Sequence, residues 1–257
     1  MEKKLKRLLA LTLSYALLFS ITIFPVAAAD TSYAKNTSDM AQETIAIIED
    51  ELQANGTNIQ RVLTELMTNY DNLSRSAETK EEQQQCAFLA ESLQTIIDDY
   101  NECSACLRDS SIIDAAEEAY LKTAVAAVIT WFTGHGLNLA AELLITAREN
   151  TDEDMVYLPF NKSGILFSPV VSELIKKGRP SGSGEFPSDG DRDLYYAIHL
   201  FNYRRTNQTF VLTDVYDYEL GDQSYPDSIT DIAVDTMARA QLAGIIVPYT
   251  VRLPIKI

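Results

Sequence analysis

The chain has 257 residues, a formal net charge of −16 at pH 7 and 46% hydrophobic residues. Nucleic acids and anionic membrane surfaces attract proteins chiefly through Lys and Arg, so this acidity excludes both from the partners that we expect. The length is enough for one large domain, or two small ones, with a hydrophobic core.

The first 29 residues have the three-part pattern of a secretory signal peptide. Four basic residues among the first seven precede an apolar run from Leu8 to about Val26, and Ala27–Ala29 then precede Asp30. This pattern predicts cleavage after Ala29 and secretion of a chain that keeps no stable membrane span. An uncleaved membrane anchor is the alternative, because the apolar run is about long enough to cross a bilayer. Pro25 and the alanines favour cleavage.

Residues 30–150 have the periodicity of a helical bundle. We expect one helix over about 37–54, a second that begins after an N-cap at Asn58, and a third over about 77–100. A helical hairpin is expected over 111–150, with its turn at Gly134–Gly136. The stretch 123–141 contains no Asp, Glu, Lys or Arg. A membrane-inserting hairpin and a buried pair of core helices both fit this composition. The glycines interrupt the stretch, which favours the buried pair.

Three cysteines, Cys86, Cys103 and Cys106, raise the question of a disulfide or a metal site. Export favours one structural disulfide and one remaining thiol. A redox-active Cys-x-x-Cys needs a strand-to-helix junction, and zinc needs a second ligand pair. The only histidines, His135 and His199, are not at ligand spacing from the cysteines. We therefore predict no metal and no cofactor.

Residues 155–257 combine strand and helix signals. Short strands are expected at 156–160 and 165–167, a helix at 169–177, a polar loop at 179–193, and a hairpin of 193–205 with 209–220. A helix over 228–243 and a last strand over 245–253 follow. The sequence therefore predicts an α+β fold, in which an N-terminal helical bundle precedes a small, mostly antiparallel sheet with one or two helices.

The second hairpin strand carries the candidate site. Strand alternation places Asp214 on one face with Phe210, Leu212, Tyr216 and Tyr218, and it places Asp217 on the other face. A buried carboxylate needs a partner. A two-residue or a four-residue connection brings His199 to the face of Asp214, whereas a three-residue connection does not.

A His199–Asp214 pair beside tyrosines suits either general acid-base catalysis or a structural polar contact. In either role, the pair predicts that Asp214→Asn destabilises the fold. The candidate catalytic residues are Asp214, Tyr216, Asp217 and His199. Because Asp217 is expected on the other face, we expect it to matter less than Asp214 and Tyr216.

The segment Asp214-x-Tyr216-Asp217 resembles the signature of the colicin M family, toxins that cleave the lipid-linked peptidoglycan precursor. The family signature continues with His-Arg, where this chain has Gln223 and Ser224. The resemblance implies a hydrolase in which all three matched residues act as one unit.

A longer resemblance covers residues 131–144, 193–205, 213–220 and 240–249, which together are similar to secreted proteins of uncharacterised function in Gram-positive bacteria. This resemblance supports export and implies no activity. Two functional hypotheses follow from the sequence. The chain is a non-catalytic extracellular protein that binds another protein or a cell-envelope component, or it is an envelope-directed hydrolase or phosphatase. An open pocket containing the four candidate residues favours the enzyme, and a sheet face covered by the 228–243 helix favours binding or structure.

Overall fold

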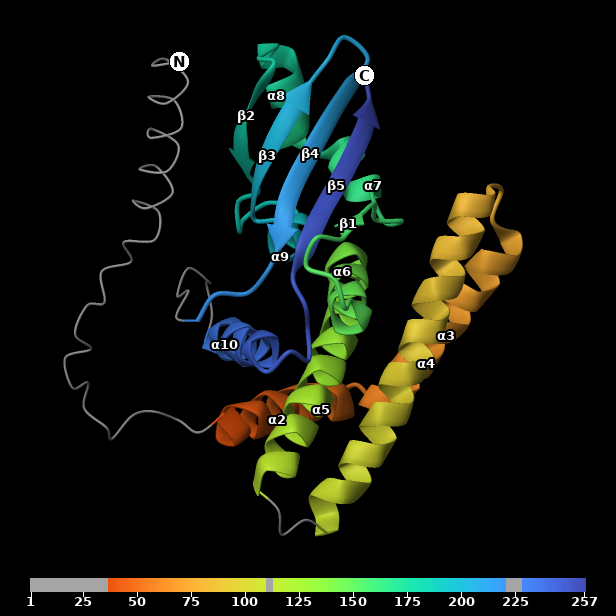
Figure 1. Ribbon diagram of the computed structural model, residues 1–257, viewed down its shortest axis with the longest axis vertical. Coiled ribbons are helices and arrows are strands. Elements are labelled where there is room, and N and C mark those ends of the chain that lie inside the picture. Colours follow the sequence, from red (N-terminus) through yellow and green to blue (C-terminus); the bar gives the residue numbers. More distant parts are fainter. Residues whose placement is uncertain (1–36, 110–112, 221–227) are drawn as a thin grey trace, which may run out of the picture. The chain divides into compact units, whose positions relative to one another are not determined.

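A computed structural model describes residues 37–109, 113–220 and 228–257 (Figure 1). N-terminal helices pack together and are followed by a five-stranded, mostly antiparallel sheet with short helices, which confirms the predicted α+β class. The leader predicted over residues 1–29 lies outside the described residues, so its cleavage stays a prediction.

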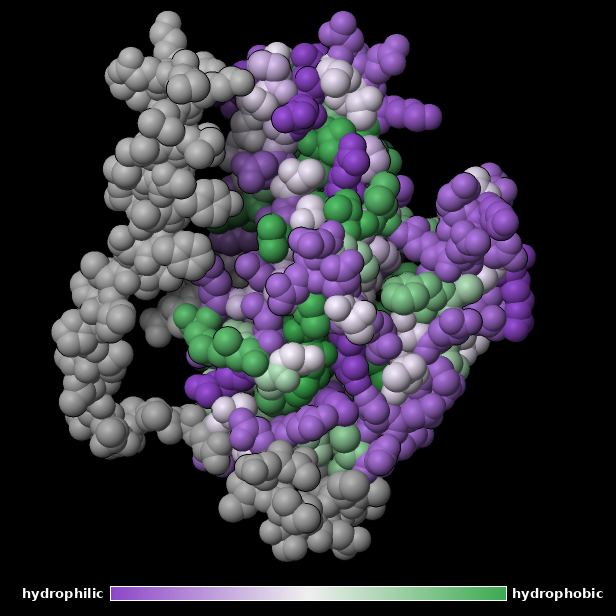
Figure 2. Space-filling model, viewed as in Figure 1, coloured by the Kyte–Doolittle hydropathy of each residue, from purple (hydrophilic) through white to green (hydrophobic). Residues whose placement is uncertain are grey.

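The helical part follows the apolar periodicity of the sequence. Asn58 caps α3 as predicted, because its side chain accepts a hydrogen bond from the N–H of Arg61. Mostly hydrophilic side chains cover the outward sides of α3 and α4 (Figure 2). The helices are α2 (Thr37–Ala54), α3 (Ile59–Ser76), α4 (Lys80–Asp109), α5 (Ile113–Gly134) and α6 (Asn138–Glu149).

Helices α5 and α6 form the predicted core hairpin. The chain turns after Gly134, and Gly136 has φ +71°, a left-handed conformation that favours glycine. The uncharged stretch 123–141 is largely buried between the other helices and the sheet, since Val125, Ile129 and Ala140 have no exposed surface. Within the described ranges, no helix has the length and apolar character needed to span a membrane.

The sheet has the strand order β1-β5-β4-β3-β2, with β1 parallel to β5 and the other neighbours antiparallel. The strands are β1 (Val156–Tyr157), β2 (Ser181–Glu185), β3 (Leu200–Arg205), β4 (Thr209–Tyr216) and β5 (Tyr249–Lys256). The short helices of this part are α7 (Ser163–Phe167), α8 (Pro169–Lys177) and α9 (Arg192–Ala197).

Some segments predicted as strands are helical instead. Residues 165–167 belong to α7, and the start of the predicted strand 193–205 belongs to α9. Helix α9 forms because the Asp191 side chain accepts hydrogen bonds from the N–H groups of Asp193 and Leu194, which caps the first turn. The last strand begins at Tyr249 and continues to Lys256, later than the predicted range.

The predicted polar loop 179–193 contains strand β2, so that prediction was wrong for residues 181–185. Gly182 and Gly184 lie opposite Tyr203 and Phe201 of β3. A Cβ atom at Gly184 would lie 2.4 Å from Cζ of Phe201. The glycines thus leave room for aromatic rings from the neighbouring strand, which supply the apolar surface that β2 itself lacks.

The disulfide predicted for the cysteines is not present among the described residues. Cys86 is a free, buried thiol, and no disulfide joins it to Cys103. Both belong to α4, where 17 residues of helix separate them by about 25 Å, far beyond the reach of a disulfide. The side chain of Cys106 lies outside the described residues.

Helix α10 (Ser228–Leu242) lies beside α2 and α5 (Figure 1), although it follows the hairpin in the sequence. The hydroxyl groups of Thr44 and Thr236 are 3.0 Å apart, and Arg239 donates a hydrogen bond to Thr37 at 2.9 Å. Buried side chains of the predicted helical region and of the α+β region also belong to one hydrophobic core.

Candidate functional site

The four candidate residues line one pocket at the end of β4. This pocket, called the acidic pocket below, has a volume of about 240 Å³. Its described lining residues are Tyr195, Tyr196, Ala197, His199, Leu200, Asp214, Val215, Tyr216, Asp217, Tyr218, Glu219 and Val234.

The β3–β4 hairpin has the four-residue connection, one of the two registers predicted to bring His199 and Asp214 together. Arg205 pairs with Phe210, which is the register of a connection over residues 206–209, although β4 already begins at Thr209. The same register, continued beyond the strand, aligns His199 with Tyr216. Strand alternation and the hairpin connection together bring the candidate residues to one place.

Asp214 lies on the inner face of the sheet as predicted. It pairs with Val251 of β5 and is partly buried between Leu212 and Tyr216. Burial raises the pKa of its carboxyl group to about 7, and the charge of Asp217 acts in the same direction. A hydrogen bond from the N–H of Val215 opposes this rise. The Asp214 carboxyl group therefore titrates near neutral pH.

Asp217 lines the same pocket as Asp214, although strand alternation predicted the two residues on opposite faces. The reason is that β4 ends at Tyr216, so strand alternation does not extend to the next residue. Burial raises the pKa of Asp217, and the nearby charge of Glu219 adds to this effect. The effect of Glu219 indicates that negative charge is concentrated at this end of the sheet.

His199 shares the pocket with Asp214 but pairs with a different carboxylate. Its Nε2 lies 3.4 Å from Oε1 of Glu185 in β2, and its ring lies 4.9 Å from the ring of Tyr195. Among the described residues, no hydrogen bond or ion pair joins His199 to Asp214. The predicted His–Asp pair is therefore replaced by a His–Glu contact at the sheet edge.

The tyrosines of the pocket form their own hydrogen bonds. The hydroxyl groups of Tyr216 and Tyr218 are 2.7 Å apart. Burial raises the pKa of Tyr218, so this phenol stays protonated at neutral pH. The backbone N–H of Tyr218 donates to the side chain of Gln241, which ties the segment after β4 to α10. Contacts between the segment after β4 and α10 thus hold the wall of the pocket.

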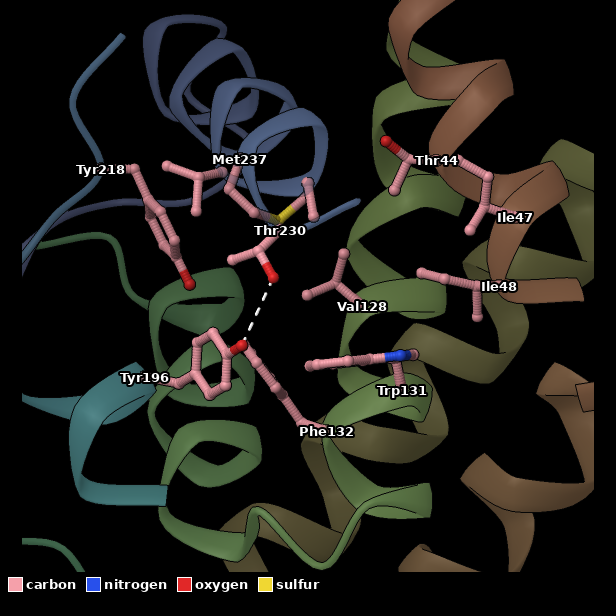
Figure 3. A pocket seen from close by; sticks show the side chains of 12 residues that line it. Thr44, Ile47, Ile48, Val128, Trp131, Phe132, Tyr196, Tyr218, Thr230 and Met237 are labelled. Carbon is pink, nitrogen blue, oxygen red and sulfur yellow. Dashed lines mark hydrogen bonds between the residues drawn. The ribbon is translucent and has the colours of Figure 1, made fainter. Parts of the chain in front are cut away.

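A second pocket, called the apolar pocket, lies between α2, α5 and α10 and has a volume of about 40 Å³ (Figure 3). Tyr196, Tyr218 and Val234 line both pockets. The apolar pocket is lined by Thr44, Ile47, Ile48, Val128, Trp131, Phe132, Tyr196, Tyr218, Thr230, Ala233, Val234 and Met237.

Sequence reasoning missed the apolar pocket. The one feature of the sequence that points to this pocket is Trp131, the single Trp of the chain, which lies inside the uncharged stretch 123–141. The indole N–H of Trp131 donates to Glu51 at 2.9 Å, and the guanidinium of Arg192 lies 5.9 Å from the ring centroid. These partners are distant in the sequence, so no local pattern shows them.

Two aspartates of the predicted polar loop 179–193, Asp191 and Asp193, have structural roles. Asp191 caps α9, and Asp193 accepts hydrogen bonds at 2.9 Å from the N–H groups of Leu139 and Ala140 at the start of α6. Within the described part of the chain, no group of three or more His, Cys, Asp or Glu residues is arranged to hold a metal ion.

Comparison with protein-family models, with curated proteins and with solved structures found no match.

Proposed function

We propose that this chain is an exported, non-catalytic binding protein of the extracellular space or cell envelope, and that the acidic pocket is its ligand site. One observation carries the proposal: Asp214, Asp217 and Glu219 line the pocket, and no described lining residue is Lys or Arg. Grouped carboxylates attract cations and repel anions. The expected partner is therefore a protein or envelope component that presents a cationic group.

The leader pattern of residues 1–29 supports the export part of this proposal. N-terminal sequencing of the secreted protein tests it, and we expect the sequence to begin at Asp30. A protein that begins at Met1 and stays in the membrane would overturn the export proposal without affecting the pocket.

Two peptides of opposite charge test the ligand site. At pH 8, Ac-Gly-Lys-Gly-amide should bind at least about fivefold more tightly than Ac-Gly-Glu-Gly-amide, because the carboxylates attract the ammonium group. Isothermal titration measures both affinities. Asp214→Asn and Asp217→Asn should each reduce binding of the Lys peptide.

Asp189→Asn is the matched control, since it removes the same charge from an exposed position outside the pocket. Equal affinity for the two peptides would overturn the proposal, and so would an equal loss in the control variant.

A hydrolase acting on an envelope substrate, which the colicin M resemblance implies, is the second candidate function. The observation that favours it is that His199, Asp214, Tyr216 and Asp217 line one pocket. A carboxyl pKa of about 7 for Asp214 suits general acid-base catalysis at neutral pH. Against it, an anionic pyrophosphate would face the same carboxylates that attract cations.

The assay for this second function measures phosphate or pyrophosphate released from a polyprenyl-linked substrate. Activity that is lost equally in folded Asp214→Asn and Asp217→Asn variants would establish the hydrolase over the binding protein. No release by the parent protein would exclude this reaction.

A further inference from the structure

A polar hollow lies on the outer face of the sheet, which is the face opposite the hydrophobic core. This hollow, called the basic hollow below, has a volume of about 750 Å³. Arg204 and Arg252 line it, and none of its described lining residues is Asp or Glu. Both arginines belong to the outer face because they alternate with the buried residues Tyr203 and Leu253. The hollow is therefore cationic, although the formal net charge of the chain is −16.

The two guanidinium groups of the basic hollow are free to contact a ligand. Both side chains are exposed, and within the described part of the chain neither forms a hydrogen bond or an ion pair. In the helical part, by contrast, Arg61, Arg75 and Arg148 are each paired with a carboxylate. Charges more than about 8 Å away are largely screened at physiological salt, so an anion in the hollow interacts mainly with these two cations.

The edge strand β2 adjoins the basic hollow, because Ser181 and Ser183 belong to its lining. The N–H of Phe186 donates a hydrogen bond to the carbonyl oxygen of His199 at 2.9 Å. In an antiparallel ladder, residues that bond to the neighbouring strand alternate with residues whose backbone groups point the other way. The N–H and C=O groups of Ser181, Ser183 and Glu185 therefore point away from β3, toward the open edge.

The backbone groups at this edge have no partner among the described residues. Strand β2 pairs with β3 alone and lies at one edge of the sheet (Figure 1). Ser181, Ser183 and Glu185 are exposed. The strand at the opposite edge, β1, has two residues, whereas β2 has five and contains no Pro or Lys that would protect it from pairing. An open edge of this kind is a template for an added strand.

We propose that an extended acidic segment of a partner protein adds to β2 as a sixth strand. Every second side chain of an added strand lies over the outer face. Neighbouring strands are about 4.8 Å apart, so a Glu beside Ser181 lies within the combined reach of its own side chain and that of Arg204, which pairs with Ser181. The segment therefore carries Asp or Glu at alternate positions. This surface is separate from the acidic pocket, since no described residue lines both.

Two peptides test the requirement for acidic side chains in the parent protein. Ac-Thr-Glu-Thr-Glu-Thr-Glu-Thr-amide places all its Glu side chains on one face of a strand, and the matched peptide has Gln in place of each Glu. Isothermal titration at pH 7 measures both affinities. We expect the Glu peptide to bind at least about tenfold more tightly than the Gln peptide, because only carboxylates are complementary to the two guanidinium groups.

Two N-methylated forms of the Glu peptide distinguish strand addition from simple anion binding. One form carries its N-methyl groups on the Glu residues, and the other carries them on the Thr residues. The backbone N–H groups of alternate residues point to opposite sides of a strand, so one of these two sets faces β2. We expect one methylated peptide to lose binding by about tenfold or more and the other to bind as the unmethylated peptide does.

Variants locate the surface. Ser183→Pro removes an N–H group that points away from β3, so it should weaken binding of the Glu peptide by at least about tenfold without breaking the β2–β3 ladder. Ser183→Ala keeps the N–H group and is the matched control. Arg204→Gln should weaken binding by about fivefold, with the exposed Arg61→Gln as its control. Circular dichroism checks that the variants fold, and the peptide comparisons in the parent protein do not depend on them.

The outcomes separate this proposal from its alternatives and from the proposed function. Equal binding of the Glu and Gln peptides would overturn the acidic segment, and equal binding of the two methylated peptides would overturn strand addition. A parent dimer in sedimentation velocity that becomes a monomer in Ser183→Pro would identify a second copy of this chain as the occupant instead. Asp214→Asn should leave binding of the Glu peptide unweakened, whatever its effect on the acidic pocket. A loss in that variant would place the peptide in the acidic pocket and overturn the proposal.

Discussion

Two carboxylates, Glu142 in α6 and Asp214 in β4, are withdrawn from solvent in very different surroundings. Glu142 has no exposed surface and accepts four hydrogen bonds, from the Tyr157 hydroxyl, the N–H of Phe160, and the backbone and side-chain N–H groups of Asn161. Asp214 is partly buried, lines an open pocket and has the N–H of Val215 as its stabilising donor.

This difference separates a structural carboxylate from one available to a ligand. Burial raises the pKa of both groups, but around Glu142 the four donors oppose that rise and tie α6 to the segment after β1. A buried polar group that is fully hydrogen-bonded stabilises one conformation, whereas an incompletely satisfied group has capacity for a partner. Glu142 therefore has a structural role, whereas Asp214 is the carboxylate for which we propose ligand binding.

The largest effect expected from this comparison is the loss of stability in Glu142→Gln. The amide NH₂ of Gln cannot accept the hydrogen bonds that two N–H groups donate to one carboxylate oxygen, so those donors lose their acceptor. We expect the free energy of unfolding to fall by about 3 kcal/mol. Urea denaturation measures the change, with the exposed Glu153→Gln as the control. Similar stability of the two variants would show that the four hydrogen bonds contribute little.

At alkaline pH, Asp214→Asn should raise the free energy of unfolding, whereas Glu142→Gln should lower it. The folded-state pKa of Asp214, about 7, lies above its ordinary value of 3.8, so the folded protein holds the proton more tightly than the unfolded chain. The protonated carboxyl group of Asp214 therefore stabilises the fold at low pH, and this contribution is lost as the pH rises from about 4 to 7. At pH 8 we expect Asn to stabilise the fold by roughly 1–3 kcal/mol, and at pH 4 to change little.

Unfolding of both proteins by urea at pH 4 and pH 8 checks this sign. The sequence predicted that the substitution destabilises the fold, because a pair with His199 was expected. In the structure His199 contacts Glu185 instead, and we therefore expect the opposite sign at pH 8. A destabilised Asn variant at pH 8 would restore the pairing hypothesis.

The extent to which the sequence predicts this molecule depends on how local each signal is. The apolar spacing of Ile59, Val62 and Leu63 and the cap at Asn58 are local, and they predict α3 correctly. The face of Asp214 is also local, because it follows from strand alternation.

Non-local contacts were not predictable in the same way. Glu142 obtains two of its donors from Asn161, and Trp131 bonds to Glu51, 80 residues earlier. Strand β2 has no apolar alternation, so neither the strand nor the contact between its Glu185 and His199 was visible in the sequence. A contact that depends on tertiary packing leaves no periodicity to detect.

Ligand binding provides a third way to test the comparison. Asp214→Asn and Asp217→Asn should each weaken binding of Ac-Gly-Lys-Gly-amide by about five- to tenfold at pH 8, because each removes one negative charge from the pocket lining. Folded Glu142→Gln should bind the Lys peptide as the parent protein does. Isothermal titration measures all three. If Glu142→Gln lost binding as strongly, the division between a structural and a ligand-binding carboxylate would be wrong.

The smallest effect is expected for His199→Gln. Its partner Glu185 is 60% exposed, and an exposed contact at 3.4 Å contributes at most about 0.5 kcal/mol. The more informative measurement is the pKa of Asp214, followed by NMR of its carboxyl carbon in parent and variant. Because burial, and not a histidine, raises that pKa, we expect His199→Gln to leave the titration midpoint near 7. A clear rise of the Asp214 pKa in His199→Gln would mean that the imidazolium of His199 stabilises the Asp214 carboxylate in the parent protein. His199 and Asp214 would then act as the pair that the strand pattern predicted. This result would favour the hydrolase hypothesis over the binding hypothesis.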